Sequence, residues 1–172
     1  MDFQLAHCQI RSWRESDADS LTAHANNRNV WINLRDRFPH PYAMADAYAF
    51  IRASMSSRPQ TAFAIVVDEQ AVGGIGYIPH EHEERVSAEI GYWLGEPFWG
   101  RGIATEVVRA MTPHAVRTHG LTRVYAITFA WNGASCRVLE KAGYVLEARM
   151  RKSAIKDGQI VDQLLYAYVV ES

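Results

Sequence analysis

The sequence lacks the marks of nucleic-acid-binding, membrane-spanning and secreted proteins. Its 18 lysine and arginine residues are balanced by 19 aspartate and glutamate residues, and the formal net charge of -1 predicts no strongly basic surface for nucleic acid or an anionic membrane. No apolar run approaches the roughly 20 residues that a membrane-spanning helix needs. The stretch Met1–Leu5 has neither the basic nor the apolar region of a signal peptide.

Cysteine is also scarce. The chain has only Cys8 and Cys136, which are far apart and lack the close spacing of a metal site. We therefore expect two reduced thiols, no metal, and a cytoplasmic protein. The 172 residues suffice for one hydrophobic core but hardly for two, which predicts a single domain over residues 1–172.

What the chain does contain is an ordinary globular composition, 48% hydrophobic and 22% charged, with blocks of strand-like and helix-like sequence. Strands are expected at residues 7–13, 61–68, 71–79, 86–94, 123–130, 144–155 and 160–170. Helices are expected at residues 17–26, 29–34, 44–56, 103–119 and 133–142. This order predicts an α+β fold with a mixed sheet.

Local signals refine these elements. Ser16-Asp17 precedes the first long helix and is expected to cap it. Glu69-Gln70 and Asp157-Gly158 are expected to turn two β-hairpins. Pro113 interrupts the pattern of the longest helix and is expected to kink or split it. Glycines 73, 74 and 76 suggest a bulge or a close backbone approach.

The stretch Glu89–Val108 has the pattern of an anion-binding site. An apolar strand leads through Gly100 and Gly102 into a helix. The unpaired N–H groups of the first helical turn and the helix dipole favour negative charge there, and glycine lets the backbone approach a ligand closely. We therefore expect a phosphate-bearing ligand at residues 99–105.

Two nucleotide-binding devices fit this stretch poorly. A Walker loop ends in Gly-Lys-Ser or Gly-Lys-Thr, and neither tripeptide occurs in the chain. The dinucleotide fingerprint needs a third small residue and an acidic residue about 20 positions further on. Gly100–Thr105 lacks the former, and residues 122–126 contain neither aspartate nor glutamate.

A third device remains. Trp99–Ala104, with the sequence WGRGIA, resembles the acyl-CoA pyrophosphate loop of the GNAT N-acetyltransferases, and the subgroup it most resembles acts on ribosomal proteins. Further landmarks of the family follow in order at residues 88–94, 132–135, 138–144 and 157–158. The resemblance implies a GNAT-type mixed, mostly antiparallel sheet of about seven strands, flanked by helices, with splayed central parallel strands. Trp99 departs from the Arg or Gln that the motif usually has at its first position.

The resemblance also implies an activity. The expected reaction moves an acetyl group from acetyl-CoA, as co-substrate, to the primary amine of a protein N-terminus or small molecule by direct attack in a ternary complex. The implied cofactor-binding residues are Tyr92, Trp93, Leu94, Trp99, Gly100, Arg101, Gly102, Ile103, Ala104, Thr105, Asn132 and Ser135. The alternative is a GNAT-fold protein that binds acyl-CoA as a sensor or scaffold, because Leu139 stands where many family members have a tyrosine. A dinucleotide oxidoreductase is opposed by the order of elements.

Proton transfer needs an acid for the leaving thiolate and a base for the amine. Ser135 is the candidate acid, although it could instead satisfy a backbone group in the first helical turn. Glu89 is the candidate base, because an apolar strand deprives its carboxylate of hydration; an ion pair with an arginine is the alternative. His80, His82 and Glu83 are weaker candidates on a polar loop, and Asn132 could be a plain helix cap.

The acceptor side is the least defined part of the sequence. Phe38, His40 and Tyr42 lie on a proline-fixed loop and are the candidate acceptor-binding residues, whereas Trp31 and Tyr48 are expected in the core. The expected partners are the amine acceptor and a second copy of the chain in a homodimer. Nucleic acid and membranes are not expected.

Overall fold

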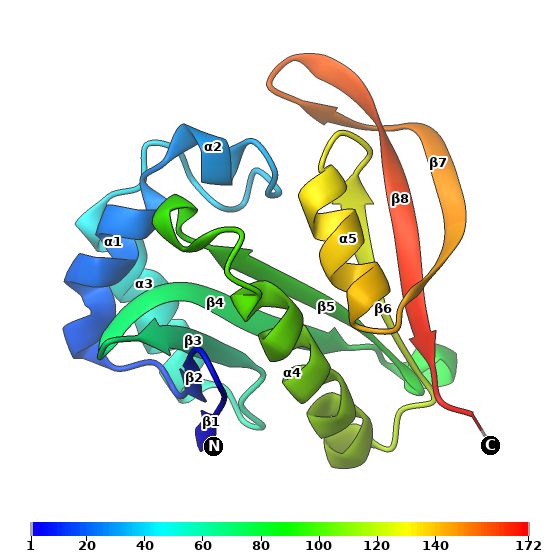
Figure 1. The fold of residues 1–172 in the computed structure, drawn as a ribbon, viewed down its shortest axis with the longest axis horizontal. Helices are drawn as coiled ribbons and strands as arrows, with labels where there is room; N and C mark the ends of the chain where they lie inside the picture. Colours follow the sequence, from blue (N-terminus) through cyan, green and yellow to red (C-terminus); the bar gives the residue numbers. More distant parts are fainter. Residues whose placement is uncertain (1, 172) are drawn as a thin grey trace. The chain divides into compact units, whose positions relative to one another are not determined.

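The computed structural model describes residues 2–171, whose strands form an eight-stranded sheet in the order β1-β2-β3-β4-β5-β6-β8-β7 (Figure 1). The strands are β1 Asp2–Gln4, β2 Gln9–Arg11, β3 Ala62–Val67, β4 Gln70–Pro79, β5 Ser87–Leu94, β6 Arg123–Phe129, β7 Val145–Lys156 and β8 Gln159–Val169. The helices are α1 Ala18–Ala25, α2 Arg28–Trp31, α3 Met44–Ser56, α4 Ile103–His119 and α5 Gly133–Lys141. Short 3-10 turns cover Glu15–Asp17, His82–Glu84 and Glu96–Phe98.

The predicted α+β class with a mostly antiparallel mixed sheet is confirmed. β5 and β6 form the parallel pair, and β2–β3, β3–β4, β6–β8 and β7–β8 are antiparallel. The expected count of about seven strands misses β1, which pairs antiparallel with β2 and is too short for an alternating pattern to be visible.

The described chain divides into two compact units. The first contains the residues up to Gly76 together with Tyr92–Val107, and the second contains Tyr77–Gly91 and the residues from Val108 onward. The single domain expected for residues 1–172 stays a prediction. No helix within residues 2–171 combines the length and apolarity needed to cross a bilayer.

The core of the first unit lies where α1 and α3 pack with each other and with strand residues. Ten buried residues form this cluster: Trp13, Ala18, Leu21, Ala25, Tyr42, Ala47, Ile51, Ala64, Val66 and Ala71. The helix spacing of Leu21 with Ala25 and of Ala47 with Ile51 places each pair on one helix face, and this explains the amphipathic pattern of both helices. Tyr48, expected in the core, is instead 38% exposed, with the Arg52 guanidinium over its ring.

Asp17 does not cap α1 with its side chain as expected. Its carboxylate instead accepts two hydrogen bonds of 2.7 Å from the buried Arg11 guanidinium and one of 2.8 Å from the Arg14 amide. A buried arginine needs a charged partner because an unpaired buried charge is costly. This demand outweighs the capping preference of Asp17.

The hairpin between β3 and β4 turns one residue earlier than expected. Asp68 and Glu69 both have positive φ, 47° and 66°, as a type I′ turn requires, and Gln70 already pairs with Val67. The predicted turn at Asp157-Gly158 is confirmed, with φ of 50° and 74°. Neither Asp68 nor Glu69 is glycine, so the sequence carried a weak signal for the first turn and a strong one for the second.

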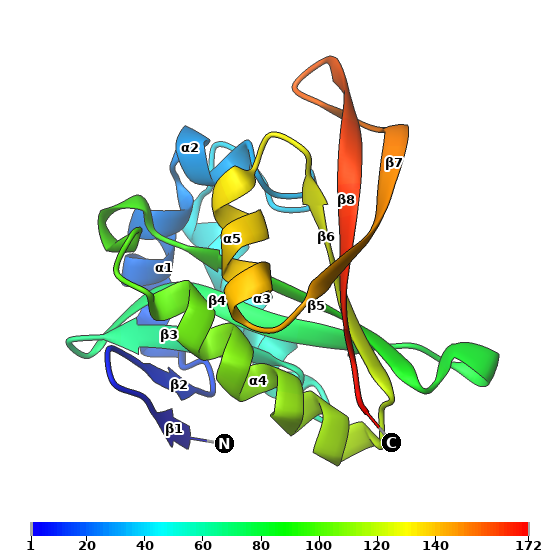
Figure 2. The ribbon, with the colours of Figure 1, turned by 45° about the vertical axis from the view of Figure 1, so that its right-hand side comes forward.

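In the second unit, β6, β8 and β7 form a long twisted antiparallel set, and α5 lies beside β6 in both ribbon views (Figure 2). α4 begins in the first unit and continues into the second as one helix through Pro113, so of the kink or split expected there the split does not occur. Proline in a helix interior costs roughly 3 kcal/mol. The fully buried face of Val107, Val108, Met111 and Ala115 provides the packing that offsets this cost.

Candidate active site

The turn between β5 and α4 has the backbone geometry of an anion cradle. Gly100 and Gly102 adopt φ of 75° and 82°, and no atom lies within 4 Å of a Cβ built on either residue. The Glu106 amide donates to the Gly102 carbonyl oxygen at 3.1 Å, and this bond opens α4. The amides of the first helical turn have no carbonyl oxygen one turn earlier in the helix to which they could donate. They are therefore available to an anion.

Trp99 closes the segment that leads into this turn. Its indole Nε1 donates to the carbonyl oxygen of Leu94 at 2.7 Å, although the side chain is 44% exposed. The main-chain amide of Trp99 also donates, to the Glu96 carbonyl oxygen at 3.1 Å. Trp99, which departs from the motif, is therefore bonded through both its side chain and its main chain to the segment that leads into the turn.

Glu96 anchors the same segment to the start of α2. Its two carboxylate oxygens accept from Asn27 Nδ2 at 2.8 Å and from Asn29 Nδ2 at 2.9 Å. The Asn27 side chain also caps α2, since its Oδ1 accepts from the amides of Asn29 and Val30. The sequence alone does not predict this clamp, because its local signal is limited to the asparagine directly before α2.

His24 of α1 supports the segment from a third direction. Its ring meets Phe98 edge to face with 5.4 Å between centroids, and a Cβ added at Gly95 would lie 2.9 Å from its Nδ1. Burial lowers the pKa of His24 below its usual value. Phe98 also contacts the exposed Arg101, whose guanidinium carbon lies 5.2 Å from the centroid of the Phe98 ring.

The end of β5 lies against β4 in the first unit. A Cβ added at Gly73 would come within 2.4 Å of the Trp93 carbonyl oxygen, so the expected close backbone approach is confirmed. Leu94 is buried, and Tyr92 and Trp93 are half-buried. Their backbone contacts with a cofactor stay predictions.

The three candidate acceptor residues occupy different environments. Tyr42 belongs to the first unit's core, and burial together with the Asp46 carboxylate raises its pKa to about 12. Phe38 is packed between Tyr42 and Trp93, with ring centroids 5.0 and 5.4 Å away. His40 is exposed and stacks on Trp31 at 5.4 Å. Phe38 thus connects the acceptor loop to a predicted cofactor-binding residue.

In the second unit, β5 and β6 pair in parallel over Ser87–Glu89 and Arg123–Tyr125. Glu89 is half-buried and stands directly opposite Tyr125, so the two side chains leave the same face. His80 Nε2 and Tyr125 Oη share a hydrogen bond of 2.9 Å, and their rings are stacked. A pocket of about 200 Å³ is lined by His80, Glu84, Ser87, Arg123, Tyr125 and Leu165.

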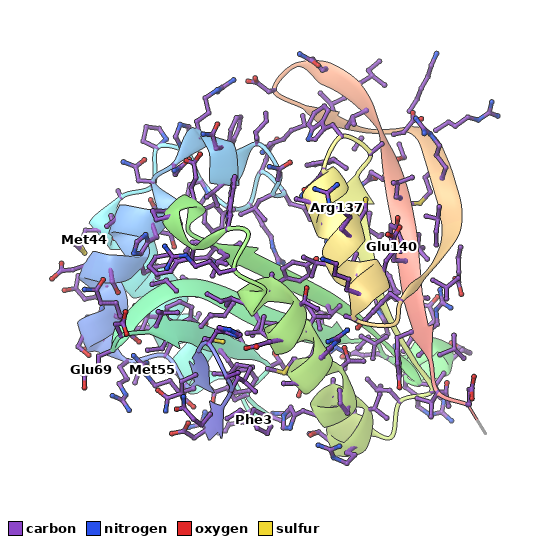
Figure 3. The ribbon with its side chains drawn as sticks, viewed as in Figure 1. Phe3, Met44, Met55, Glu69, Arg137 and Glu140 are labelled. Carbon is purple, nitrogen blue, oxygen red and sulfur yellow. The ribbon has the colours of Figure 1, made fainter. Side chains whose placement is uncertain are left out.

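Asn132 caps α5. Its Oδ1 accepts from the Ser135 amide at 3.1 Å, so the helix-capping interpretation is confirmed, whereas its cofactor contact stays a prediction. Leu139 is fully buried, and no hydroxyl is offered at that position. Figure 3 shows Arg137 and Glu140 on the same helix, and Glu140 accepts a hydrogen bond of 3.0 Å from the buried Tyr166 hydroxyl.

The structure therefore brings Tyr92–Thr105 together as one segment of the first unit, and places Glu89, Asn132 and Ser135 in the second. The catalytic roles of Glu89 and Ser135 stay predictions. Within residues 2–171, no cluster of three or more histidine, cysteine, aspartate or glutamate side chains is arranged to hold a metal ion.

Comparison with known proteins identifies relatives that are similar in sequence to part of this chain. An N-acetyltransferase of Bacillus subtilis (strain 168), YoaA, is 32% identical over 101 residues, which are 59% of this chain and 56% of that protein. The ribosomal-protein-serine acetyltransferase of Escherichia coli (strain K12) is 28% identical over 110 residues, 64% of this chain and 61% of that protein. The chain thus matches little more than half the length of these two relatives.

The fold has counterparts among solved structures. The ribosomal L7/L12 α-N-protein acetyltransferase RimL, in complex with coenzyme A, superimposes with a TM-score of 0.85 over 99% of this chain and 98% of that chain, at 20% sequence identity. A likeness at this identity establishes the fold. The model of the acetyltransferase (GNAT) domain matches residues 8–145, which is most of the chain. The chain therefore belongs to the GNAT acetyltransferase family.

Proposed function

We propose that this chain transfers the acetyl group of acetyl-CoA to a primary amine of a protein N-terminus or small molecule by direct attack in a ternary complex. The observation that carries the proposal is the turn at Gly100 and Gly102, whose left-handed glycines leave open space before the first turn of α4. This geometry suits the pyrophosphate of coenzyme A, because backbone amides and the helix dipole both favour a bound anion.

The cofactor would be held mainly by main-chain groups. The amides of Gly102–Thr105 would bind the pyrophosphate, with the exposed Arg101 guanidinium and the Thr105 hydroxyl adding side-chain donors. Main-chain groups of Tyr92–Leu94 would hold the pantetheine arm and polarise the thioester carbonyl. Asn132 would add a contact to that arm while continuing to cap α5.

Two residues would handle the protons. Acetyl-CoA supplies an activated acyl carbon and a thiolate that must be protonated as it leaves. Glu89, which is half-buried and stands opposite Tyr125 across the parallel strand pair, would accept the proton of the attacking amine. The Ser135 hydroxyl, in the first turn of α5, would donate to the thiolate.

A protein N-terminus is the acceptor class to examine first, because the Escherichia coli relative is a ribosomal-protein-serine acetyltransferase. Phe38, His40 and Tyr42 would form the acceptor side. His40 is the exposed member of the three, so it is the one available for direct contact with an acceptor. A cytoplasmic location is also proposed, since Cys8 and Cys136 are both free thiols. A homodimer stays a prediction.

The test is release of free coenzyme A from acetyl-CoA in the presence of an amine panel. The panel contains peptides with N-terminal serine or alanine, their N-acetylated counterparts, polyamines, aminoglycosides and free amino acids. We expect amine-dependent release with at least one class and none with the blocked peptides. Mass spectrometry of the acceptor should then show the acetyl group on its amine.

A second candidate function is acyl-CoA binding without efficient catalysis. The observation that favours it is the fully buried Leu139, which offers no proton donor where many family members have a tyrosine. Calorimetry with acetyl-CoA separates the two candidates. Tight binding with no turnover on any amine would favour a sensor or scaffold, whereas turnover would eliminate it.

A further inference from the structure

Trp99 holds the segment that precedes the glycine turn by two hydrogen bonds. Its indole N–H reaches back five residues to the Leu94 carbonyl oxygen at 2.7 Å, and its main-chain N–H reaches the Glu96 carbonyl oxygen at 3.1 Å. The first bond ties the end of β5 to the residue directly before Gly100. The side-chain and main-chain hydrogen bonds of Trp99 together therefore fix the direction in which the chain enters the turn.

Packing alone does not account for this tryptophan. The side chain is 44% exposed, so much of the apolar surface that usually justifies a tryptophan remains in water. The indole N–H is instead used on a main-chain carbonyl. Leu94 is also one of the three residues whose backbone is proposed to hold the cofactor arm, so the bond joins the proposed arm site to the proposed pyrophosphate turn.

The turn itself needs such support. Gly100 and Gly102 both have positive φ, and a Cβ on either would touch nothing, so neither glycine is held by packing at that position. Glycine loses more backbone entropy on ordering than any other residue. A turn of this kind binds an anion well only if its conformation is set before the anion arrives.

We propose that Trp99 is a positioning residue, whose indole N–H holds the Gly100–Gly102 turn in its pyrophosphate-binding conformation through the Leu94 carbonyl. This rests on the proposed use of acetyl-CoA. Trp99 need not touch the cofactor for this role. Glu96, clamped by Asn27 and Asn29, anchors the same segment two residues after Leu94, so loss of the indole bond loosens the turn without releasing the whole segment.

The test is the substitution Trp99→Phe, which removes the N–H donor and keeps an aromatic ring. Loss of one hydrogen bond is expected to weaken coenzyme A binding about three- to tenfold by calorimetry. The KM for acetyl-CoA should rise by the same factor while kcat changes less than about twofold. With S-acetylpantetheine, which has no pyrophosphate, kcat/KM should be that of the wild-type protein.

Trp131→Phe is the matched control. Trp131 is 42% exposed and also follows a strand, but its ring packs on Phe129 and lies outside the glycine turn. This variant should keep the wild-type affinity for coenzyme A. Thermal unfolding of both variants checks that they are folded. If Trp99→Phe folds poorly, Trp99→Leu also lacks a side-chain donor and undergoes the same comparison.

Two results would overturn the inference. One is wild-type affinity for coenzyme A in the folded Trp99 variant. The other is an equal loss with acetyl-CoA and S-acetylpantetheine, which would indicate a general loosening rather than positioning of the turn. Failure of the wild-type protein to bind coenzyme A would instead refute the proposed function, and the same calorimetric series distinguishes that case.

Discussion

At the scale of single residues, the anion cradle depends on its glycines, which have no Cβ. Gly102 combines a left-handed φ of 82° with open space around its missing Cβ. A side chain there would meet two separate penalties, one from the backbone conformation and one from occupying the space of a bound anion. Gly158, in the β7–β8 turn, has φ of 74° and equally open space, but it faces no proposed ligand.

This pair of glycines gives the first prediction. Gly102→Ala and Gly158→Ala should each lower the free energy of unfolding by about 1–2 kcal/mol, because both place alanine in the left-handed region. Only Gly102→Glu should weaken acetyl-CoA binding, by roughly tenfold or more, because its carboxylate opposes the pyrophosphate. Calorimetry measures the affinities, and Gly158→Glu is the control. Unchanged affinity in a folded Gly102→Glu variant would refute the loop assignment.

The second prediction concerns Ser135. If its hydroxyl protonates the leaving thiolate, Ser135→Ala should lower kcat by roughly 100-fold while the Kd for acetyl-CoA changes less than about twofold. The backbone amide of residue 135 still reaches Asn132 in the variant, so the α5 cap is kept. Ser153→Ala, on β7, serves as control. Steady-state kinetics decide, and a wild-type rate would leave Ser135 with a structural role only.

Some of these residue roles could be read from sequence and others could not. Asn132 directly precedes a helix-like stretch, so its cap was predictable from local chemistry. The Trp99–Leu94 bond was not, because a main-chain carbonyl becomes an acceptor only once the intervening loop has its shape. The clamp on Glu96 joins residues almost 70 positions apart, and a single sequence carries no signal for such a pairing.

At the scale of elements, strong local patterns gave the correct bounds. The helix Met44–Ser56 was predicted to the residue, because apolar positions recur at helical spacing and a proline-containing loop precedes it. Of the kink or split predicted at Pro113, the split does not occur, because α4 has a buried face that sequence cannot weigh against the cost of proline. β1 was missed because its pairing with β2 arises from tertiary contact and not from its own three residues.

The close approach of β4 and β5 provides the third prediction. A Cβ at Gly73 would lie 2.4 Å from the Trp93 carbonyl oxygen, which is main chain and cannot rotate away. Gly73→Ala should therefore lower the free energy of unfolding, measured by urea denaturation, by about 1–3 kcal/mol. It should also weaken acetyl-CoA binding, since it displaces the backbone of a proposed cofactor-binding residue.

Gly91→Ala is the control for this element. It is also a glycine in β5, but nothing lies within 4 Å of its missing Cβ, so its substitution should change stability by less than about 0.5 kcal/mol. If Gly73→Ala proved as stable as the wild-type protein, the close packing of the two strands would not be the reason for the glycine.

At the scale of the whole molecule, the response to pH reports on how the chain unfolds. His24 lies in the first unit and His114 in the second, and burial lowers the pKa of both below the ordinary value of 6.5, with Arg117 assisting at His114. Below about pH 6.5 the unfolded chain therefore binds more protons than the folded one at these two positions. Their contribution to stability is complete above pH 6.5 and is lost as the pH falls through the folded pKa values.

The fourth prediction follows from this sign. The free energy of unfolding should fall as the pH is lowered from 7 towards 5, and His24→Gln and His114→Gln should each flatten that dependence. The ion-paired Glu147 and Asp162, whose pKa values are lowered mainly by hydrogen bonds from Arg123 and from the Lys152 amide, act only at more acidic pH, so they do not obscure the histidine effect. Urea unfolding at each pH provides the measurement.

The same two variants test the single domain predicted for residues 1–172. If the chain unfolds as one cooperative domain, both substitutions should shift one common transition, and fluorescence and circular dichroism should follow it at the same urea concentration. If the two compact units unfold separately, His24→Gln should move one transition and His114→Gln the other. Acetyl-CoA should then raise the stability of the transition that contains the glycine turn the most, because most of the proposed cofactor-binding residues lie in that unit. Two transitions that respond independently would therefore refute the single-domain prediction while leaving the assignment of the pyrophosphate turn intact.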